Sequence, residues 1–539
     1  MVKAVLANSL WCLASSRAFV AFSRALNDPD AAQERILGAL LYANRDTAFG
    51  REHDFRGLRS PADFSQRVPI RSYDELSPWI DRIRRGETQV LTSKPVIRLV
   101  PTSGATASRK LIPYTRQTQQ QLNAAIGPWI FDLYRRYPRA LRGASYWSIS
   151  PVSQKVVASA KTSAVPIGFE DDSEYLGVMR RILVGVSVAV PPEIRQIPSV
   201  EAWRYVTALL LLRNENLSLI SVWHPSFLQL LLQEIKQNWQ RLLLDIAGGT
   251  CAVIPALPHT TVKTLQLRRD ARRAKQLEQL AQAAPDQWWR NLAVVSCWAD
   301  GHAQGAAVEL AQSLGKVAIQ PKGLIATEGI VSIPFAGVHP LAIRSNYFEF
   351  EDESGYVWPA SALKLNCEYK VVLTTAGGLY RYRLDDLVVA DSTVGQTPSI
   401  RFVGKSAHIS DRRGEKLSDG FVASVLAKCL SEIHTALSFA MLAPDTDVGG
   451  CRYTLYLSAD VPTAICATLD QLLSANPHYA YCRKLGQLHA PRLFQVSDNA
   501  YISYCQRLQD MGKCLGEIKP TALSSLDDWS RFLPGRYIA

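Results

Sequence analysis

Hydrophobic residues recur at helical spacing through roughly the first 90 residues, with polar stops at NDPD and SPAD. Asp28-Pro29-Asp30 is typical of a helix start and precedes the segment AAQERILGALLYAN. From about residue 95 to 405, short β-branched runs alternate with helical segments. The expected strands are KVVASA, LISVW, LAVVSCWA, KVAIQPKGLIAT and YKVVLTT, and one long helix is expected over residues 226–247. This alternation predicts an α/β body with a substantial parallel sheet.

The hydrophobic periodicity collapses in VGKSAHISDRRGEKLSDG, residues 403–420, where charged residues, glycine and serine take over. Such a change favours a domain boundary. Beyond it, YTLYLSA is expected as a strand with helices on either side, which indicates a small α+β domain. We predict a large domain over residues 1–405 and a small domain over residues 406–539.

The N-terminal stretch MVKAVLANSLWCLASSRAFVAFSRAL looks superficially like a signal peptide. Arg17 and Arg24 interrupt its apolar run, and its apolar positions have helical spacing, so we predict an amphipathic surface helix. No run approaches the roughly 20 apolar residues of a membrane span, so none is expected. The ten cysteines form no CxxC pair, which favours reduced thiols in a cytoplasmic protein. We also expect a monomer.

Charge is distributed unevenly along the 539 residues. From Ser406 onward basic and acidic residues balance, so the net charge of +12 lies in the first 405 residues. A basic body suits an anionic ligand such as a nucleotide, and also nucleic acid or a membrane surface. The densest basic run, LRRDARRAK at residues 267–275, is predicted to be the solvated face of a helix.

The segment LVPTSGATASRKLIPYT, residues 99–115, contains the first candidate site. Ser103, Gly104 and Thr106 follow an expected strand, so their hydroxyl and backbone N–H groups could surround an anion. The segment lacks the second glycine of a Walker loop. An ordinary loop is the alternative.

The segment GLIATEGIVSIP, residues 323–334, places Glu328 between two apolar runs that are expected to be strands. A carboxylate at a strand end beside a phosphate site commonly holds Mg²⁺. A helix cap or a salt bridge is the alternative role.

The segment TTAGGLYRYRLDDLVVADS, residues 374–392, is the third candidate. Gly377-Gly378 predicts a turn, after which Tyr380 to Arg383 alternate as in a strand, followed by Asp385-Asp386. An acidic residue at such a turn can accept hydrogen bonds from ribose hydroxyls. A plain hairpin with an aspartate turn is the alternative.

Taken together, the three segments resemble the auxin-responsive Gretchen Hagen family of acyl acid amido synthetases, and in particular a bacterial-type member. The family belongs to the adenylate-forming enzymes, and it carries a loop like SSGTTxGxxKxIP, a motif ending in [ST]-E, and YRxGD, in this order. Further segments agree along the whole chain: ANRDTAFGREHDF, VPIRSYDELSPWIDRIRRGETQVLT, SNYFEFEDESG, FVGKSAHISDRRGEKLSD and GKCLGEIKP. The resemblance implies a large firefly-luciferase-like α/β domain joined by a hinge to a small α+β domain.

The resemblance also implies roles for individual residues. The ATP phosphates would be held by a loop that begins at Thr102, with Ser103, Gly104 and Thr106. Thr327 would contact the α-phosphate, Glu328 would ligate Mg²⁺, and Tyr382 and Asp386 would bind the nucleotide, Asp386 through its ribose. Two lysines would act in catalysis, Lys416 near the hinge and Lys519 at the reacting carboxylate. Departures from the family pattern are Ala105, Ser108, Leu324, Asp385 and Lys405.

The reaction implied is ATP- and Mg²⁺-dependent activation of a small carboxylic acid as an acyl adenylate, with release of pyrophosphate. The acyl group would then pass to an amine, for which an amino acid is the family's usual choice. A thiol acceptor, such as coenzyme A or a carrier protein, is the alternative. A non-catalytic nucleic-acid-binding protein would need basic residues interleaved with aromatic ones, which the basic runs lack, so no nucleic-acid partner is expected. The acyl acid itself is not readable from the sequence.

Overall fold

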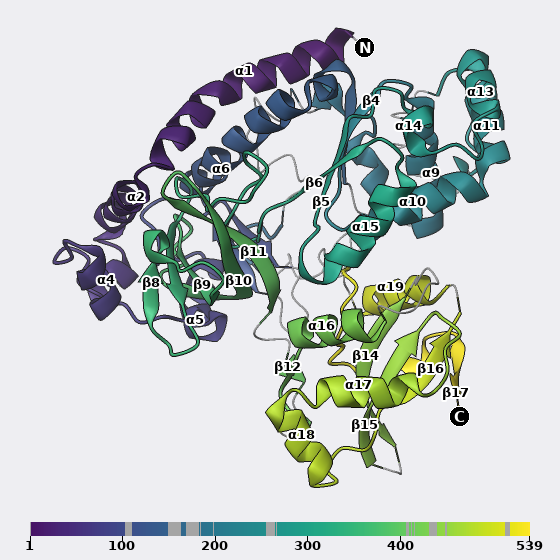
Figure 1. The fold of residues 1–539 in the computed structure, drawn as a ribbon. Helices are drawn as coiled ribbons and strands as arrows, with labels where there is room; N and C mark the ends of the chain where they lie inside the picture. Colours follow the sequence, from purple (N-terminus) through teal and green to yellow (C-terminus); the bar gives the residue numbers. More distant parts are fainter. Residues whose placement is uncertain are drawn as a thin grey trace. The chain divides into compact units, whose positions relative to one another are not determined.

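The computed structural model shows two compact units (Figure 1). It describes residues 2–102, 110–148, 163–168, 183, 185–197, 199–254, 265, 267–405, 409–410, 412–413, 415–430, 439–447, 450–497, 499–511 and 518–538. The first unit comprises Met1–Ala299, Ala303–Leu384 and Val388–Arg401, and the second comprises Asp300–His302, Asp385–Leu387 and Phe402–Ala539. The division predicted from the sequence at residue 405 stays a prediction.

A four-stranded parallel sheet lies in the first unit, with its strands side by side in chain order. The strands are β3 (Ala144–Trp147), β4 (Leu217–Ser221), β5 (Val294–Cys297) and β6 (Ala318–Pro321). Every residue of β4 and β5 is buried, as expected for parallel strands that are covered on both faces. The prediction of an α/β body with a parallel sheet is confirmed, whereas the predicted strand KVVASA lies outside the described residues.

A second sheet of the first unit has five strands in the order β11, β10, β9, β7, β8. They are β7 (Tyr347–Glu351), β8 (Val357–Pro359), β9 (Glu368–Thr374), β10 (Tyr382–Val394) and β11 (Thr397–Lys405), and the last of these continues into the second unit. A separate antiparallel hairpin is formed by β1 (Arg98–Pro101) and β2 (Leu111–Tyr114).

Helices surround these sheets (Figure 1). Those of the first unit include α1 (Val2–Ala25), α2 (Pro29–Asn44), α3 (Ala48–Glu52), α4 (Pro61–Arg67), α5 (Tyr73–Arg84), α6 (Arg116–Arg136), α9 (Val200–Arg213), α10 (Pro225–Gln237), α11 (Trp239–Gly248), α13 (Ala271–Glu278), α14 (Pro285–Trp288) and α15 (Gln304–Ser313). The predicted start at NDPD is confirmed, because Asp28 accepts a hydrogen bond from the Ala31 N–H and caps α2.

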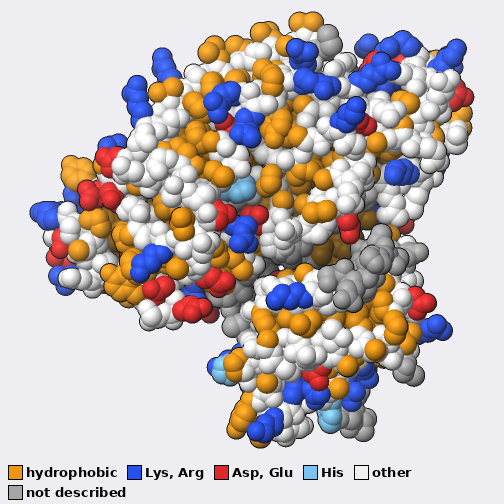
Figure 2. Space-filling model, in the orientation of Figure 1, with side chains coloured by type: hydrophobic (Ala, Val, Ile, Leu, Met, Phe, Trp, Pro, Cys, Tyr) orange, Lys and Arg blue, Asp and Glu red, His pale blue; other side chains and the backbone are white. Residues whose placement is uncertain are grey.

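The N-terminal helix α1 packs lengthwise on α6 (Figure 1). Its inner face buries Trp11 and Phe22, and the Asn8 amide donates to the Gly143 carbonyl at 2.8 Å. Its outer face exposes Val2, Leu6, Leu10, Leu13 and Val20. In Figure 2, hydrophobic side chains are mixed with basic ones over the region of α1 and α6.

By length and composition, the 24-residue helix α1 is also long and apolar enough to cross a membrane, and most of its apolar stretch is not buried. One such helix near the N-terminus is weak evidence, because core helices and signal sequences have the same properties. The expectation that the chain has no membrane span therefore stays a prediction.

The structure has two helices, α10 and α11, where a single helix is predicted over residues 226–247. That prediction is wrong because the helix breaks at Asn238. Asn238 leaves helical geometry with φ −106° and ψ 20°, and its side chain donates to the Glu234 carboxylate at 2.7 Å. An asparagine whose side chain bonds locally competes with the helix, which explains the break.

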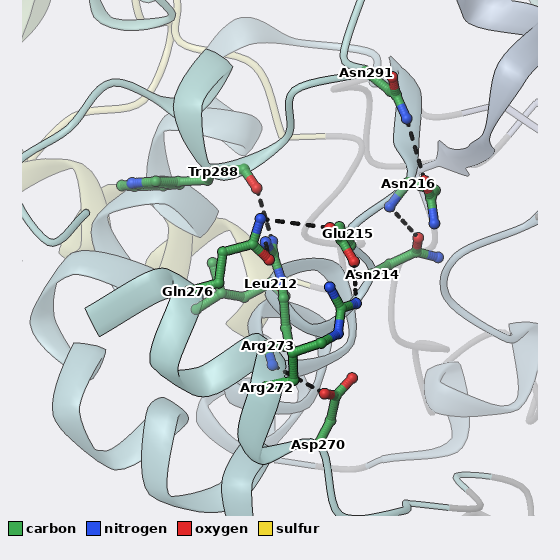
Figure 3. A network of polar contacts seen from close by, with 10 residues as sticks. All are labelled: Leu212, Asn214, Glu215, Asn216, Asp270, Arg272, Arg273, Gln276, Trp288 and Asn291. Carbon is green, nitrogen blue, oxygen red and sulfur yellow. Dashed lines mark hydrogen bonds and ion pairs between the residues drawn. The ribbon is translucent and has the colours of Figure 1, made fainter. Parts of the chain in front are cut away.

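The basic run at residues 267–275 is only partly a solvated face. Arg268, Arg269 and Arg272 are exposed, but Arg273 is 1% exposed. Figure 3 shows the Arg273 guanidinium among Leu212, Gln276 and Trp288. It donates to the Leu212 and Trp288 carbonyls and to the Gln276 side chain at 2.7–3.1 Å. The buried arginine thereby satisfies a carbonyl in the last turn of α9.

The second unit contains a four-stranded sheet in the order β14 (Ala440–Asp447), β15 (Gly450–Leu457), β16 (Arg492–Val496), β17 (Gly535–Ile538). Only β15 and β16 are parallel in this sheet. The unit also has the short pair β12 (Ile409–Ser410) and β13 (Leu417–Ser418), and helices α16 (Asp419–Cys429), α17 (Ile465–Leu473), α18 (Pro477–Lys484) and α19 (Ala500–Asp510). The mixture of a mainly antiparallel sheet and helices confirms the predicted α+β character.

Candidate active site

The β1–β2 hairpin holds both ends of the predicted phosphate loop. Pro101 pairs with Leu111, and the Thr102 N–H donates to the Lys110 carbonyl at 2.9 Å, so the loop starts and ends at adjacent points. The Thr102 hydroxyl is buried and has no partner among the described residues. Ser103, Gly104 and Thr106 lie outside the described residues, so their roles stay predictions.

Thr327 and Glu328 occupy the tip of a tight turn. Ala326 and Gly329 exchange two backbone hydrogen bonds, of 3.1 and 3.2 Å, and Ile325 bridges Ile330. The prediction of a strand on each side is wrong, because β6 ends at Pro321 and residues 322–346, all of which the structure describes, form only isolated bridges.

Glycine explains why the chain folds back so tightly here. A Cβ atom on Gly323 would lie 2.3 Å from the Ser332 carbonyl oxygen, and one on Gly329 would lie 2.7 Å from the Asn346 amide nitrogen. The Leu324 N–H also donates to the Ser332 hydroxyl at 2.9 Å. These close approaches present Glu328 at the end of a compact hairpin rather than at the end of a long strand.

Three segments that are distant in sequence meet at Tyr382. The Lys110 ammonium donates to the Tyr382 hydroxyl at 3.2 Å, and that hydroxyl donates to the Glu328 carboxylate at 3.5 Å. Lys110 also lies 5.9 Å from the ring centre of Tyr73, whose hydroxyl accepts from the Leu111 N–H. Glu328 is only 9% exposed and Lys110 is half-buried, so the Tyr382 hydroxyl connects a cation to a carboxylate that is largely shielded from water.

Lys110 is the functional candidate that the sequence prediction left out. The signal was present, because Lys110 stands at the lysine of the loop pattern SSGTTxGxxKxIP. Only the folded chain shows that this lysine, at the last position of the loop, donates to the Tyr382 hydroxyl, which in turn donates to Glu328.

The alternation predicted for Tyr380 to Arg383 is wrong, because β10 begins only at Tyr382. Arg381 has a φ of +46°, a left-handed conformation that is uncommon for a side chain of this kind. Its N–H donates to the Thr374 hydroxyl, and its guanidinium forms an ion pair of 2.9 Å with Glu349. This anchored kink sends Tyr380 into the core and directs the Tyr382 hydroxyl toward Glu328.

Beneath the kink, two segments noted in the sequence form an aromatic platform. The ring of Phe49 stacks on Tyr380 at 4.7 Å and on His53 at 4.1 Å, and the Arg71 guanidinium covers Phe49 at 5.0 Å. Burial lowers the pKa of His53, which favours the neutral ring that accepts from Arg71 at 2.9 Å. The Arg71 N–H and carbonyl pair with Arg381 and Arg383, so the platform fixes the start of β10.

The remaining predicted residues group with the second unit. Asp386 is 4% exposed and belongs to the short piece Asp385–Leu387 of that unit. Lys416 is exposed, with a φ of +45°, and its carbonyl accepts from the Asn476 amide at 3.2 Å. Lys519 is half-buried, and its carbonyl accepts from the Tyr504 hydroxyl at 2.8 Å. The nucleotide and catalytic roles of these three residues stay predictions.

The donor set of the first unit suits Mg²⁺ that is bound together with a polyphosphate. Among the described residues no three His, Cys, Asp or Glu side chains cluster as ligands. Mg²⁺ in nucleotide sites usually takes one or two carboxylates together with substrate phosphates and water. The buried Glu328 carboxylate and the unpartnered Thr102 hydroxyl fit such a site.

The chain matches family models along most of its length. Residues 19–319 match the GH3 family N-terminal domain, residues 339–405 the GH3 family central domain, and residues 421–526 the GH3 family C-terminal domain. It is 22% identical to indole-3-acetic acid-amido synthetase GH3.4 of Arabidopsis thaliana, over 81% of this chain and 78% of that protein. It is 21% identical to jasmonoyl–L-amino acid synthetase JAR6 of Nicotiana attenuata, over 71% of this chain and 70% of that protein.

Solved structures share the fold. The AtGH3.15 acyl acid amido synthetase in complex with 2,4-DB has a TM-score of 0.84 and 17% identity, covering 97% of this chain and 96% of that one. A 2-hydroxyisobutyryl-CoA ligase in the postadenylation state has a TM-score of 0.50 and 13% identity, covering 94% and 92%. The architecture is therefore that of adenylate-forming ligases. The chain belongs to the GH3 family, the Gretchen Hagen family that its sequence resembles.

Proposed function

We propose that the protein is an ATP- and Mg²⁺-dependent acyl acid amido synthetase, which joins a small carboxylic acid to an amino acid. The observation that carries the proposal is the line of contacts from Lys110 through Tyr382 to Glu328. It brings one residue from each of the three motif segments into one place. Membership of the GH3 family and the relatives named as amido synthetases support it.

The first step activates the acid. A carboxylate oxygen attacks the α-phosphorus of ATP, the bond to the β-phosphate breaks, and pyrophosphate leaves, which yields the acyl adenylate. Negative charge moves onto the departing phosphates, so the groups that matter are fixed donors and cations near them. Lys110 supplies a cation at the end of the phosphate loop, and the Thr102 hydroxyl is a free donor at its start.

Glu328 would hold Mg²⁺, which when bound neutralises phosphate charge. Tyr382 fixes the Glu328 carboxylate by donating to it and receives a hydrogen bond from Lys110. Lys519 is proposed as the cation at the reacting carboxylate, and Lys416 and Asp386 as further contacts to the nucleotide, on the resemblance of their motifs.

The second step forms the amide. The nitrogen of the amino acid attacks the acyl carbon, AMP leaves with the electrons of the broken carbon–oxygen bond, and the nitrogen loses a proton. An amino acid is proposed over a thiol because the relatives JAR6 and GH3.4 are named as synthetases of amino-acid conjugates or amides.

The test is pyrophosphate release from ATP with a panel of carboxylic acids, with an amino-acid mixture or coenzyme A as the acceptor. We expect acid-dependent release and an amide product whose mass identifies both halves. Glu328→Ala and Lys519→Ala should each abolish release, whereas Glu353→Ala, at an exposed carboxylate, should not. Thioester formation without any amide would overturn the choice of acceptor, and no acid-dependent release with any acid would overturn the proposal.

A further inference from the structure

Lys322 is a buried lysine with no carboxylate partner among the described residues; the nearby acidic group is the Cys297 thiol of β5, whose own pKa is raised by burial. It follows the last residue of β6 and is 5% exposed. Its ammonium lies 4.6 Å from the ring centre of Trp223 and 5.9 Å from that of Trp129. Within the described residues it forms no ion pair, so two indole faces are its neighbours in place of a carboxylate.

A row of polar side chains lies beside this lysine. The register of the parallel sheet places Ser221, Ser296 and Gln320 side by side on β4, β5 and β6. Lys322 comes two residues after Gln320, so both belong to the same face of the strand. That face is covered by α6, since the Trp129 indole N–H donates to the Gln320 side chain at 3.0 Å.

The hydroxyls of this row lack partners. Ser221 is 2% exposed and Ser296 is 1% exposed, and neither hydroxyl has a hydrogen-bond partner in the part of the chain that the structure describes. Most buried polar atoms of native proteins are hydrogen-bonded, and a charged group is buried only with compensation. Burial also lowers the pKa of Lys322 to about 7. This face of the sheet therefore has a cation and two hydroxyls that can bind a ligand.

The position of the face suits a ligand. In open α/β sheets, ligands bind at the carboxyl ends of the parallel strands, which is where Ser221, Ser296 and Lys322 lie. Trp223, whose ring centre lies 4.6 Å from the Lys322 ammonium, is 37% exposed, so one of the residues beside the lysine is accessible to solvent.

The distance to the candidate active site suits a small acid. Lys322 and Glu328 are six positions apart in the chain. A chain of that length spans at most about 20 Å. A carboxylic acid whose reacting carboxylate lies near Glu328 can thus place its other end beside Lys322.

We propose that Lys322, with the Ser221 and Ser296 hydroxyls, binds a second carboxylate of the acyl substrate, at the end away from the reacting one. The body of that substrate is apolar or aromatic and lies against Trp129 and Trp223. The substrate class is therefore a dicarboxylic acid with an apolar or aromatic body. This inference rests on the proposed function, because it concerns the acid that the enzyme activates.

The first test measures binding to the full chain without ATP, by calorimetry. The probes are terephthalate, naphthalene-2,6-dicarboxylate and biphenyl-4,4′-dicarboxylate, each paired with the acid that lacks the second carboxylate. We expect at least one dicarboxylate to bind ten times or more tightly than its paired acid. Lys322→Met should remove that preference and leave binding of the paired acid unchanged.

Two further variants sharpen the test. Ser221→Ala with Ser296→Ala keeps the lysine and should reduce the preference about three- to tenfold, since it removes two hydrogen-bond donors. Lys364→Met is the matched control, because Lys364 is exposed and lies over a tryptophan ring, that of Trp358, at 4.9 Å. It should bind every probe as the unaltered protein does.

Adenylation with the same pairs separates this inference from the proposed function. One outcome would overturn the second-carboxylate site alone. In it, several monocarboxylic acids support pyrophosphate release, but the unaltered protein and Lys322→Met each use both members of every pair equally well. The absence of release with every acid would overturn the proposed function. A preference for dicarboxylates that Lys322→Met leaves intact would also overturn the role of Lys322.

Discussion

The first unit surrounds two arginines and two lysines in different ways. Both arginines and Lys322 are buried, whereas Lys110 is half-buried. Arg273 and Arg381 are surrounded by acceptors: Arg273 donates four hydrogen bonds, and Arg381 pairs with Glu349 while also donating to the Ser65 and Val68 carbonyls. Lys110 and Lys322 instead lie over aromatic rings, and Lys110 reaches one hydroxyl.

This difference distinguishes charged side chains that stabilise the fold from charged side chains that can bind a ligand. A planar guanidinium has five donors in fixed directions, so it can satisfy several carbonyls and hold segments together. A lysine over an aromatic ring retains donors for another molecule. We interpret the two arginine clusters as closed, structural networks and the Lys322 site as an open one that is completed by a substrate.

The largest effect on stability is expected when a closed network is broken by substitution. Arg381→Met leaves Glu349, which is 4% exposed, without its counter-charge. Removal of one partner from a buried pair typically costs about 3–5 kcal/mol. We expect the free energy of unfolding in urea to fall by that amount. The double variant Arg381→Met with Glu349→Leu should be less destabilised, and equal loss in both variants would contradict a closed ion pair.

The next effect concerns Glu328 in the candidate active site. Loss of a fixed charge or donor at developing charge typically lowers the rate about 10²–10³-fold. Glu328→Gln is therefore expected to reduce pyrophosphate release by that factor with little change in unfolding temperature. Glu353→Gln, at an exposed carboxylate, is the control. A variant that unfolds more easily but retains its rate would show that Glu328 is structural.

We expect burial of Lys322 to make the free energy of unfolding depend on pH. Burial lowers its pKa to about 7 from an ordinary value of 10.5, so the unfolded chain binds a proton that the folded chain releases between these values. Stability therefore rises with pH between about 7 and 10.5, by at most about 1.4 kcal/mol per pH unit, and below pH 7 Lys322 adds no further pH dependence.

Relative to Lys322→Met, the unaltered protein should gain about 2 kcal/mol of unfolding free energy between pH 7.5 and 9, measured with urea. Other titrating groups cancel in this difference. A constant difference across this range would contradict a lysine that is buried without a negative partner.

A smaller effect is expected when the hydroxyls of two nearby tyrosines are removed in turn. Tyr382→Phe removes the hydroxyl between Lys110 and Glu328 and should lower kcat/KM for MgATP about tenfold, which equals about 1.4 kcal/mol. Tyr380→Phe removes a core hydroxyl that donates to the Leu91 carbonyl at 2.7 Å. It should cost about 1 kcal/mol of stability and leave kcat/KM unchanged. An exchange of these outcomes would show that the Tyr382 hydroxyl is structural and that the Tyr380 hydroxyl acts in catalysis.

The smallest effect is expected at a surface pair. Arg272 is 72% exposed in its side chain and forms an ion pair with Glu215, beside the buried Arg273 (Figure 3). Exposed pairs contribute about 0–1 kcal/mol. Arg272→Ala should change the unfolding temperature little, whereas Arg273→Met should lower it clearly. Equal effects would show that burial does not distinguish these adjacent arginines.

Local patterns predicted much of the fold. The cap at Asp28, the buried runs that became β4 and β5, and the mixed composition beyond residue 406 all depend on residues close together in the sequence. The three motif segments and the family were readable for the same reason. The break at Asn238 and the kink at Arg381 were not, because a hydrogen-bonding side chain or a buried ion pair overrides the local periodicity there.

By itself, the sequence determined the family, the α/β class and the residue types that suit ATP and Mg²⁺, since these follow from short-range spacing and motif. Tertiary structure alone decided which charged residues are closed in networks and which remain open. Lys110 and Tyr382 are 272 positions apart, and Lys322 meets Trp129 only across the sheet and α6. Burial and partners come from such distant segments, and they decide what a charged side chain can bind.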